Sequence, residues 1–449
     1  MNARDDRFKL MGVVLTAGTL VLSSPAFGQS VSDSVDSVSG SGTVFGGVVH
    51  TRQETQAGSD NNTRPRLGIS GDIGGSMSSG ANSLDLRYGG TLETRRSLPS
   101  GDQTDSTSIT GASRYQYDNP GGRLDFNLGH SVESVRNDTG FVLNSGDYDT
   151  RNTLSAGAGL MFYPGDLTSL RFSAEAGESF GGGALNDSES RTVASELTRR
   201  LSERSLGTLV ARRSWSENRG VDTTIDNAEL GYERELETGS FSIAAGGSWS
   251  ETEFPGQRAT NESEAVTGHV SRTWVTPESS TAIRYNRRLS DSATDLSLNL
   301  PAEFAFLPDT VRLRDLVVSD SLLVSHSTSR LCQICQVWLI AEGTVLQSEL
   351  TDTKTHEYRT TMSLDVDLTR LHELRVAYSW QGDAGEDSGN LVQQTHRLDI
   401  AITRRLAENT RLGVELNQAW VRRDEQNRDQ EQYGLRVFLT RDFSLLARR

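Results

Sequence analysis

The 449-residue chain is acidic and polar, with a formal net charge of −15, a hydrophobic fraction of 35% and a mean hydropathy of −0.48. This composition is too polar for a helical membrane protein. The acidic balance argues against a nucleic-acid-binding protein, which would show a basic patch and a high pI. Proline is scarce at 9 residues, and because proline cannot donate a hydrogen bond to a sheet, its scarcity suits a chain that is mostly strand.

The N-terminus has the pattern of a secretion signal. A basic start is followed by an apolar stretch from Leu10 to Leu22 and by the small-x-small sequence Ala26-Phe-Gly28. We therefore expect a signal peptide over residues 1–28 and a mature chain that begins near Gln29. A membrane-anchoring helix is the alternative, but the apolar stretch is short for a full span.

After the signal, the chain divides into a lead-in and a long repetitive region. Residues 29–42 are rich in Ser, Gly, Val and Asp without a useful period, and we expect a flexible periplasmic lead-in there. From residue 43 to 449 the chain is predicted to form a barrel, with strands over about 43–443. The reason is that runs of alternating apolar and polar residues recur, and a period of two gives a strand one apolar and one polar face.

The clearest alternation lies near the C-terminus. We expect one set of side chains to face outward and a second, charged set to face inward; the outward set is Leu398, Ile400, Ile402, Leu412, Val414 and Leu416, and the inward set is Arg397, Asp399, Arg411 and Glu415. A packed soluble core would not tolerate so charged a face, whereas a water-filled lumen does.

Short turns alternate with longer polar connections along the region. The expected short turns are Ser78–Ala81, Asn119–Gly122, Pro164–Leu167, Ser202–Ser205, Glu237–Gly239, Pro277–Ser280, Cys332–Cys335, Thr369–His372 and Ala407–Asn409. This predicts an all-β fold, a transmembrane antiparallel up-and-down barrel of about 18 to 20 strands. Residues 195–201 also carry leucines at helical spacing, so a helix stays open there.

Aromatic and basic residues gather near the predicted strand ends. Tryptophans there suit the interfacial girdles of a membrane barrel; they are Trp215, Trp249, Trp274, Trp380 and Trp420. Arginine pairs end strands that run outward; they are Arg95-Arg96, Arg212-Arg213, Arg287-Arg288 and Arg422-Arg423. One arginine of each pair is expected to face lipid, where it could hold lipopolysaccharide phosphate or serve as solvated rim charge.

Three further segments carry candidate functional residues. Cys332-Gln-Ile-Cys335 is the only cysteine pair, and a turn disulfide is expected in an oxidising compartment; redox or metal chemistry would need a second pair or a different context. The long connection over residues 291–317 holds Arg312, Arg314 and Asp315, which form a candidate pore constriction if the loop enters the lumen and an ordinary surface loop if it does not.

The third segment is the last predicted strand. Gln432, Gly434, Val437 and Leu439 resemble the C-terminal β-signal of outer-membrane barrels, although the chain continues beyond it to Arg449. This resemblance implies the barrel-assembly machinery as a partner.

No pattern for catalysis, cofactor binding or metal binding stands out. The seven histidines do not cluster, and neither a Gly-x-Ser-x-Gly elbow nor a His-Glu-x-x-His sequence occurs. We therefore expect a protein that is not an enzyme and has no cofactor.

The chain as a whole resembles the β-barrel porins found beside bacterial exopolysaccharide genes, the EpsL-like proteins of PEP-CTERM loci. The resemblance rests on the signal peptide, the recurring Leu-Thr-Arg-Arg-Leu-type turns, the long loop near residue 300 and the β-signal. It implies an outer-membrane channel that exports an exopolysaccharide or passes small polar solutes, with lipopolysaccharide and periplasmic polysaccharide-export components as partners. The alternative is a closed structural or binding barrel without transport.

Overall fold

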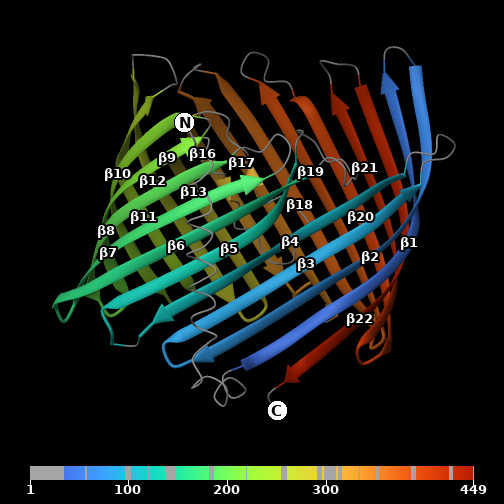
Figure 1. The fold of residues 1–449 in the computed structure, drawn as a ribbon, viewed down its shortest axis with the longest axis horizontal. Coiled ribbons are helices and arrows are strands. Elements are labelled where there is room, and N and C mark those ends of the chain that lie inside the picture. Colours follow the sequence, from blue (N-terminus) through green and yellow to red (C-terminus); the bar gives the residue numbers. More distant parts are fainter. Residues whose placement is uncertain are drawn as a thin grey trace, which may run out of the picture.

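The protein forms a closed, antiparallel all-β barrel, which confirms the predicted fold class (Figure 1). The computed structural model describes residues 35–55, 58–96, 103–119, 121–136, 148–181, 187–218, 220–253, 260–290, 296–297, 310–311, 316–332, 334–349, 353–385, 391–423 and 428–447. Within these ranges no helix is long and apolar enough to cross a membrane. The signal peptide predicted over residues 1–28 lies outside them.

The barrel wall is a single sheet of 20 strands, and a separate two-stranded sheet joins β14 and β15. The first ten wall strands are β1 (Val35–Thr55), β2 (Gly58–Ser79), β3 (Asn82–Arg96), β4 (Gln103–Asp118), β5 (Leu124–Arg136), β6 (Tyr148–Gly165), β7 (Thr168–Gly181), β8 (Ser188–Ser202), β9 (Ser205–Asn218) and β10 (Val221–Leu236). The others are β11 (Gly239–Glu253), β12 (Thr260–Thr276), β13 (Ser279–Ser290), β16 (Val317–Thr328), β17 (Cys335–Ser348), β18 (Lys354–Thr369), β19 (His372–Gly385), β20 (Leu391–Ala407), β21 (Thr410–Arg423) and β22 (Arg428–Ala447). The short pair is β14 (Leu296–Ser297) and β15 (Thr310–Val311).

Each wall strand pairs with its sequence neighbours, and the sheet closes where β1 pairs with β22. At the closure Val44 lies opposite Leu439 and Val48 opposite Leu435. Closure removes the two exposed sheet edges, whose unpaired backbone groups would be costly in lipid. The predicted strand count of 18 to 20 is therefore confirmed at its upper end.

The first and last strands are longer than predicted. β1 begins at Val35, so residues 35–42 belong to the barrel wall and not to the expected lead-in over 29–42. They are held by pairing with both neighbours, for example Gly40 with Ile73 and with Phe443. Small residues obscure the period of two in this segment, although its backbone pairs like that of any other strand.

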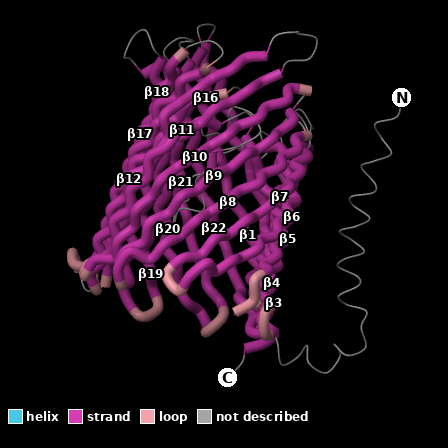
Figure 2. Tube along the Cα trace, turned by 90° about the vertical axis from the view of Figure 1, so that its left-hand side faces the viewer, coloured by secondary structure: helices cyan, strands magenta, loops and turns pink. Residues whose placement is uncertain are grey.

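The short turns lie together at one end of the barrel (Figure 2). They fall at the predicted places, and residues 195–201 lie within β8, so the helical alternative there is wrong. The start of β1 lies at the same end, since Val35 pairs with Met77 near the β2–β3 turn. Outer-membrane barrels place short turns in the periplasm and longer loops outside, which orients the barrel in the membrane.

The two faces of the wall follow the predicted alternation. Leu416 is 51% exposed on the outer face, while its neighbour Asn417 on the inner face is 9% exposed. Ile402, Leu412 and Val414 are also exposed large apolar residues, as expected for a surface that meets lipid. The register keeps Leu398 and Ile400 on that outer face and Asp399 and Glu415 on the inner one.

Candidate functional site: the lumen wall and its outer mouth

A row of charged side chains crosses the lumen face from β18 to β3. Cross-strand pairing places Asp365 opposite Arg375, and Arg375 shares its row with Glu415 and Arg436 through Ala401. Gly47 then separates Arg436 from Arg66, and Arg66 reaches Glu93. We call these six residues the charged belt; they are Asp365, Arg375, Glu415, Arg436, Arg66 and Glu93.

Every arginine of the charged belt contacts a carboxylate of the belt. The Arg375 Nε donates to Asp365 Oδ1 at 2.7 Å, and the Arg66 Nε donates to Glu93 Oε1 at 2.7 Å. Arg436 donates to Glu415 and lies over the ring of Phe45, at 5.5 Å from its centroid. Charge-assisted pairs of this kind are strong, and the fork of arginine holds each carboxylate in a fixed orientation.

Glycine makes the close approach in the charged belt possible. A Cβ on Gly47 would lie 2.2 Å from the Leu435 carbonyl oxygen and 3.1 Å from the Arg436 Cα. Any larger residue would therefore push β1 away from β22 at the position where the barrel closes.

Other lumen-facing ion pairs extend the polar surface beyond the charged belt. Arg397 donates to Asp399 with its Nε at 2.7 Å, and Arg171 contacts Asp125 at 2.6 Å across β5 and β7. Ionised groups in a dry interior would carry a large desolvation cost, whereas water around them removes that cost. The lumen wall thus carries paired charges beyond the charged belt as well.

The wall changes at the outer end of β12 and β13. These strands pair from Thr276 opposite Ser279 to Gly268 opposite Arg287, and the described residues show no pairing between them beyond that point. β12 nevertheless continues to Thr260 alongside β11, and β13 continues to Ser290 alongside β16. The wall therefore parts between β12 and β13 toward its outer end, while β13 stays paired with β16 and β16 with β17.

The outer ends of β13 and β16 pack over the lumen face of the neighbouring wall. Leu289, Leu316 and Val318 form a buried apolar cluster that contacts Ile225 on β10 and Ala265 on β12. Both contacted residues face the lumen, because their neighbours Asp226 and Val266 lie on the outer face and Val266 is 72% exposed. We call the segments 288–290 and 316–319 the inward hairpin; it narrows the outer mouth of the lumen.

Polar contacts hold the inward hairpin in place. The Ser263 hydroxyl of β12 donates to Glu349 Oε2 at 2.6 Å, and the Glu349 amide donates to the Leu316 carbonyl at 2.9 Å. Where the ladder breaks, the Arg287 Nε donates to the Val266 carbonyl at 3.0 Å. Asp320 accepts from Arg287 at 2.9 Å and from the Tyr285 hydroxyl at 2.6 Å, which fixes the guanidinium.

The inward hairpin was missed in the sequence, although one signal for it is present. Leu316, Val317 and Val318 are three consecutive apolar residues, and their exposures are 5%, 6% and 3%. A continuous apolar run, in place of alternation, indicates a strand that is covered on both faces. The predicted constriction residues Arg312, Arg314 and Asp315 lie outside the described residues, so their role stays a prediction.

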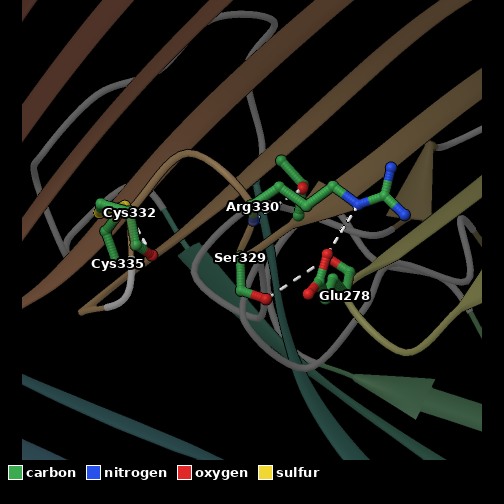
Figure 3. Close-up of a disulfide and its surroundings, with 6 residues drawn as sticks. Glu278, Ser329, Arg330, Cys332 and Cys335 are labelled. Atoms are coloured by element: carbon green, nitrogen blue, oxygen red, sulfur yellow. Dashed lines mark hydrogen bonds and ion pairs between the residues drawn. A yellow bond between two sulfur atoms is a disulfide. The ribbon is translucent and has the colours of Figure 1, made fainter.

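The structure places a disulfide between Cys332 and Cys335 in the short turn before β17, with a Cα–Cα distance of 5.3 Å (Figure 3). The same turn is tied to the β12–β13 turn. Arg330 contacts Glu278 at 3.0 Å, and the Ser329 amide donates to the Glu278 carbonyl at 3.0 Å.

The residues of the predicted β-signal all lie in β22. Gln432 and Gly434 are on the lumen face opposite Ala419 and Asn417, while Val437 and Leu439 are exposed on the outer face at 46% and 45%. Recognition of this strand by an assembly machinery stays a prediction.

The tryptophans predicted for interfacial girdles lie on the outer face. Trp215, Trp249, Trp380 and Trp420 lie toward the long-loop ends of their strands, and Trp274 lies beside the short turns. Of the paired arginines, Arg213, Arg287 and Arg422 have outer-face register. The part of the chain that the structure describes contains no group of three or more His, Cys, Asp or Glu side chains that could hold a metal ion.

No protein-family model matches the chain, and no curated protein matches it. Solved structures do match. A variant of the ferric enterobactin receptor of Pseudomonas aeruginosa, bound to enterobactin, has a TM-score of 0.50 at 11% identity and covers 91% of this chain and 82% of its own. OccK10 of Pseudomonas aeruginosa has a TM-score of 0.39 at 12% identity, and the match covers 91% of this chain and 99% of OccK10. OccAB1 of Acinetobacter baumannii has a TM-score of 0.37 at 9% identity, and the match covers 93% of this chain and 99% of OccAB1.

At this identity the likeness to the receptor concerns the fold alone. A closed barrel of 20 strands with an apolar outer face and interfacial tryptophans, sharing this fold, belongs in the bacterial outer membrane.

Proposed function

We propose that the barrel is a water-filled outer-membrane channel for the passive passage of small polar solutes. The observation that carries this proposal is the charged belt, since three arginines and three carboxylates line the lumen of a barrel large enough to enclose water. The diameter of a barrel grows with its strand number, and barrels of 16 to 18 strands are wide enough to leave an aqueous channel. The barrel wall formed by the described residues has 20 strands, which is more than 18.

The geometry of the outer mouth supports a channel with a size limit. The inward hairpin covers part of the lumen face of β10 and β12, so a solute from outside passes this apolar cluster before it reaches the charged belt. Each arginine of the charged belt contacts a carboxylate, so positive and negative charges balance locally. A balanced lining favours neutral or zwitterionic polar solutes over strongly charged ones.

Export of an exopolysaccharide is the finer form of this proposal. It is supported by the resemblance to the barrels encoded beside exopolysaccharide genes. It is supported also by Trp338, whose register opposite Ser363 places it on the lumen face, where an indole ring could stack on a sugar. A channel of this kind would work with periplasmic polysaccharide-export components as partners.

A liposome-swelling assay tests the proposal and separates its two forms. Liposomes containing the purified barrel should swell in solutions of arabinose and glucose and more slowly as the sugar grows. If linear oligosaccharides of ten or so units enter as fast as disaccharides, the export form is supported. A barrel that is folded yet admits no sugar would favour the closed structural alternative and overturn the channel.

A further inference from the structure

Three carboxylates gather on the lumen face of β17, β18 and β19, on the outer side of the charged belt. Glu357 lies directly opposite Asp383, and Glu342 of β17 lies in the next row toward the short turns. Glu357 and Asp383 are each eight residues from a member of the charged belt on the same strand, Asp365 and Arg375 respectively, so they share its lumen-facing register. We call Glu342, Glu357 and Asp383 the acidic patch.

The acidic patch is not balanced in the way that the charged belt is. Arg359 lies opposite Glu342 and acts electrostatically on all three carboxylates. Three negative charges against this one positive charge leave an excess of two negative charges. Like charges directly opposite each other on neighbouring strands destabilise a sheet, so the Glu357–Asp383 pair lowers stability where it stands. A local arrangement that lowers stability is typical of a functional site.

Two hydroxyl groups beside the acidic patch have no hydrogen-bond partner. Thr361 and Ser379 lie opposite each other on the lumen face, in the row next to Arg359 and Gln381. They are 0% and 4% exposed, and within the described part of the chain neither hydroxyl oxygen has a hydrogen-bond partner. The Oδ1 atom of Asp383, within the patch, is also buried and without one. Buried polar atoms are normally paired, so these three atoms need a partner from a ligand or from ordered water.

The acidic patch lies at the outer mouth, beside the inward hairpin. Thr344, in the same row as Glu357, pairs with Ser321 of β16, and β16 begins in the hairpin. The step from Glu357 to Asp365, at about 3.3 Å per residue and a strand tilt of about 40°, corresponds to roughly 20 Å along the barrel axis. A solute from outside therefore meets the acidic patch before it reaches the charged belt.

We propose that the acidic patch binds the ammonium group of an amino sugar, while the hydroxyl groups of Thr361 and Ser379 bond to the hydroxyl groups of the sugar. An ammonium group brings a positive charge and three donors, and a hydroxyl group both donates and accepts. This inference rests on the proposed channel, which brings polar solutes to the outer mouth. A metal ion is a poorer occupant, because the described residues contain no group of three or more His, Cys, Asp or Glu side chains that could hold one.

Isothermal titration calorimetry with the folded barrel in detergent tests the proposal. A dimer of glucosamine should bind the wild type, and its N-acetylated form, which lacks the charge, should bind about tenfold more weakly or less. Glu357→Gln with Asp383→Asn should weaken binding of the glucosamine dimer by about tenfold or more. The matched control is Glu175→Gln with Glu196→Gln, which removes two lumen-face carboxylates from β7 and β8 and should bind the dimer as the wild type does.

Two further measurements separate sugar recognition from simple charge attraction. Ser379→Ala should weaken binding of the glucosamine dimer about threefold and leave the binding of putrescine, a diamine without hydroxyl groups, unchanged. In urea without ligand, Glu357→Gln with Asp383→Asn should be at least as stable as the wild type, because it removes a like-charge pair. A loss of stability in that variant would mean that the two carboxylates support the wall, and would overturn the proposal.

The folded state of each variant is checked by its heat-modifiable migration on a gel. Equal binding of the glucosamine dimer by the wild type and the folded Glu357→Gln, Asp383→Asn variant would overturn the proposal. Putrescine that binds as tightly as the dimer, with no effect of Ser379→Ala on either, would overturn it in favour of a patch that attracts any cation. Binding needs no passage, so a barrel that admits sugars in liposomes and binds no dimer overturns only this inference, whereas binding without passage supports the site and contradicts the channel.

Discussion

The Arg287 guanidinium donates a hydrogen bond to the backbone carbonyl oxygen of Val266, at 3.0 Å, where β13 leaves β12. A side chain thus replaces the next backbone partner of the ladder, and Asp320 holds that side chain in place at 2.9 Å. Because an unpaired carbonyl near the membrane boundary would be costly, this contact allows the barrel wall to part and the inward hairpin to form.

Cysteine crosslinking tests the position of the inward hairpin. In a variant that lacks Cys332 and Cys335, cysteines at Ala265 and Leu289 should form a disulfide on mild oxidation, because Ala265 packs on the lumen side against the buried cluster that includes Leu289. The matched control places cysteines at Val266 and Leu289. Val266 points outward, so this pair should stay reduced. A bond in the control and none in the first pair would place the hairpin outside the barrel.

The charged belt should control ion selectivity. Glu415→Gln removes the carboxylate that Arg436 contacts and leaves a positive charge in the lumen. At a distance of about 8 Å in water one charge favours an anion and disfavours a cation by about 0.5 kcal/mol each, so anion permeability relative to cation permeability should rise about fivefold. Reversal potentials in a salt gradient measure this. Glu278→Gln in the β12–β13 turn is the control, and an equal shift there would show that Glu415 does not act from within the pore.

Much of the wall could be predicted from the sequence because the alternation of apolar and polar residues within each strand shows which side chains face lipid and which face the lumen. Leu412, Val414 and Leu416 alternate with polar neighbours, and lipid on one side with water on the other enforces that pattern. The inward hairpin could not be predicted in this way, since it depends on where pairing between β12 and β13 stops. Residues such as Arg287 and Asp320 look like ordinary wall charges until that break is known.

The charged belt was likewise only half predicted. Alternation gave the inward direction of Glu415, but the facing of Arg66 and Glu93 on β2 and β3 was not predicted, and neither was the contact between them. The pairing of β1 with β22 that closes the barrel could not be predicted either, because the two strands lie at opposite ends of the chain.

Substitutions on neighbouring residues should separate the two faces energetically. Leu416→Arg places a charge on the lipid-facing wall and should lower the free energy of unfolding by about 2–4 kcal/mol. Asn417→Arg places the same charge on the lumen face opposite Asp399 and should cost less than about 1 kcal/mol. Urea unfolding in lipid vesicles measures both. Equal losses would mean that the two faces meet the same environment.

Removal of the disulfide should have a small effect. The loop that Cys332 and Cys335 close is short, so the chain-entropy contribution to stability is about 2 kcal/mol at most. The turn also keeps its contacts from Ser329 and Arg330 to Glu278. Cys332→Ser with Cys335→Ser should therefore fold, with a slightly lower unfolding midpoint and unchanged conductance. Failure of this variant to fold would show that the disulfide does more than close a turn.

Single-channel recording in planar bilayers tests the central claim most directly, because an open wet lumen must conduct ions. The purified wild-type barrel should give discrete conductance steps, and Arg287→Ala, which frees the Val266 carbonyl and loosens the inward hairpin, should give larger steps. Arg272→Ala, on the outer face, should leave the step size unchanged. A folded, heat-modifiable wild-type barrel that inserts into the bilayer and stays electrically silent, with Arg287→Ala equally silent, would contradict an open lumen.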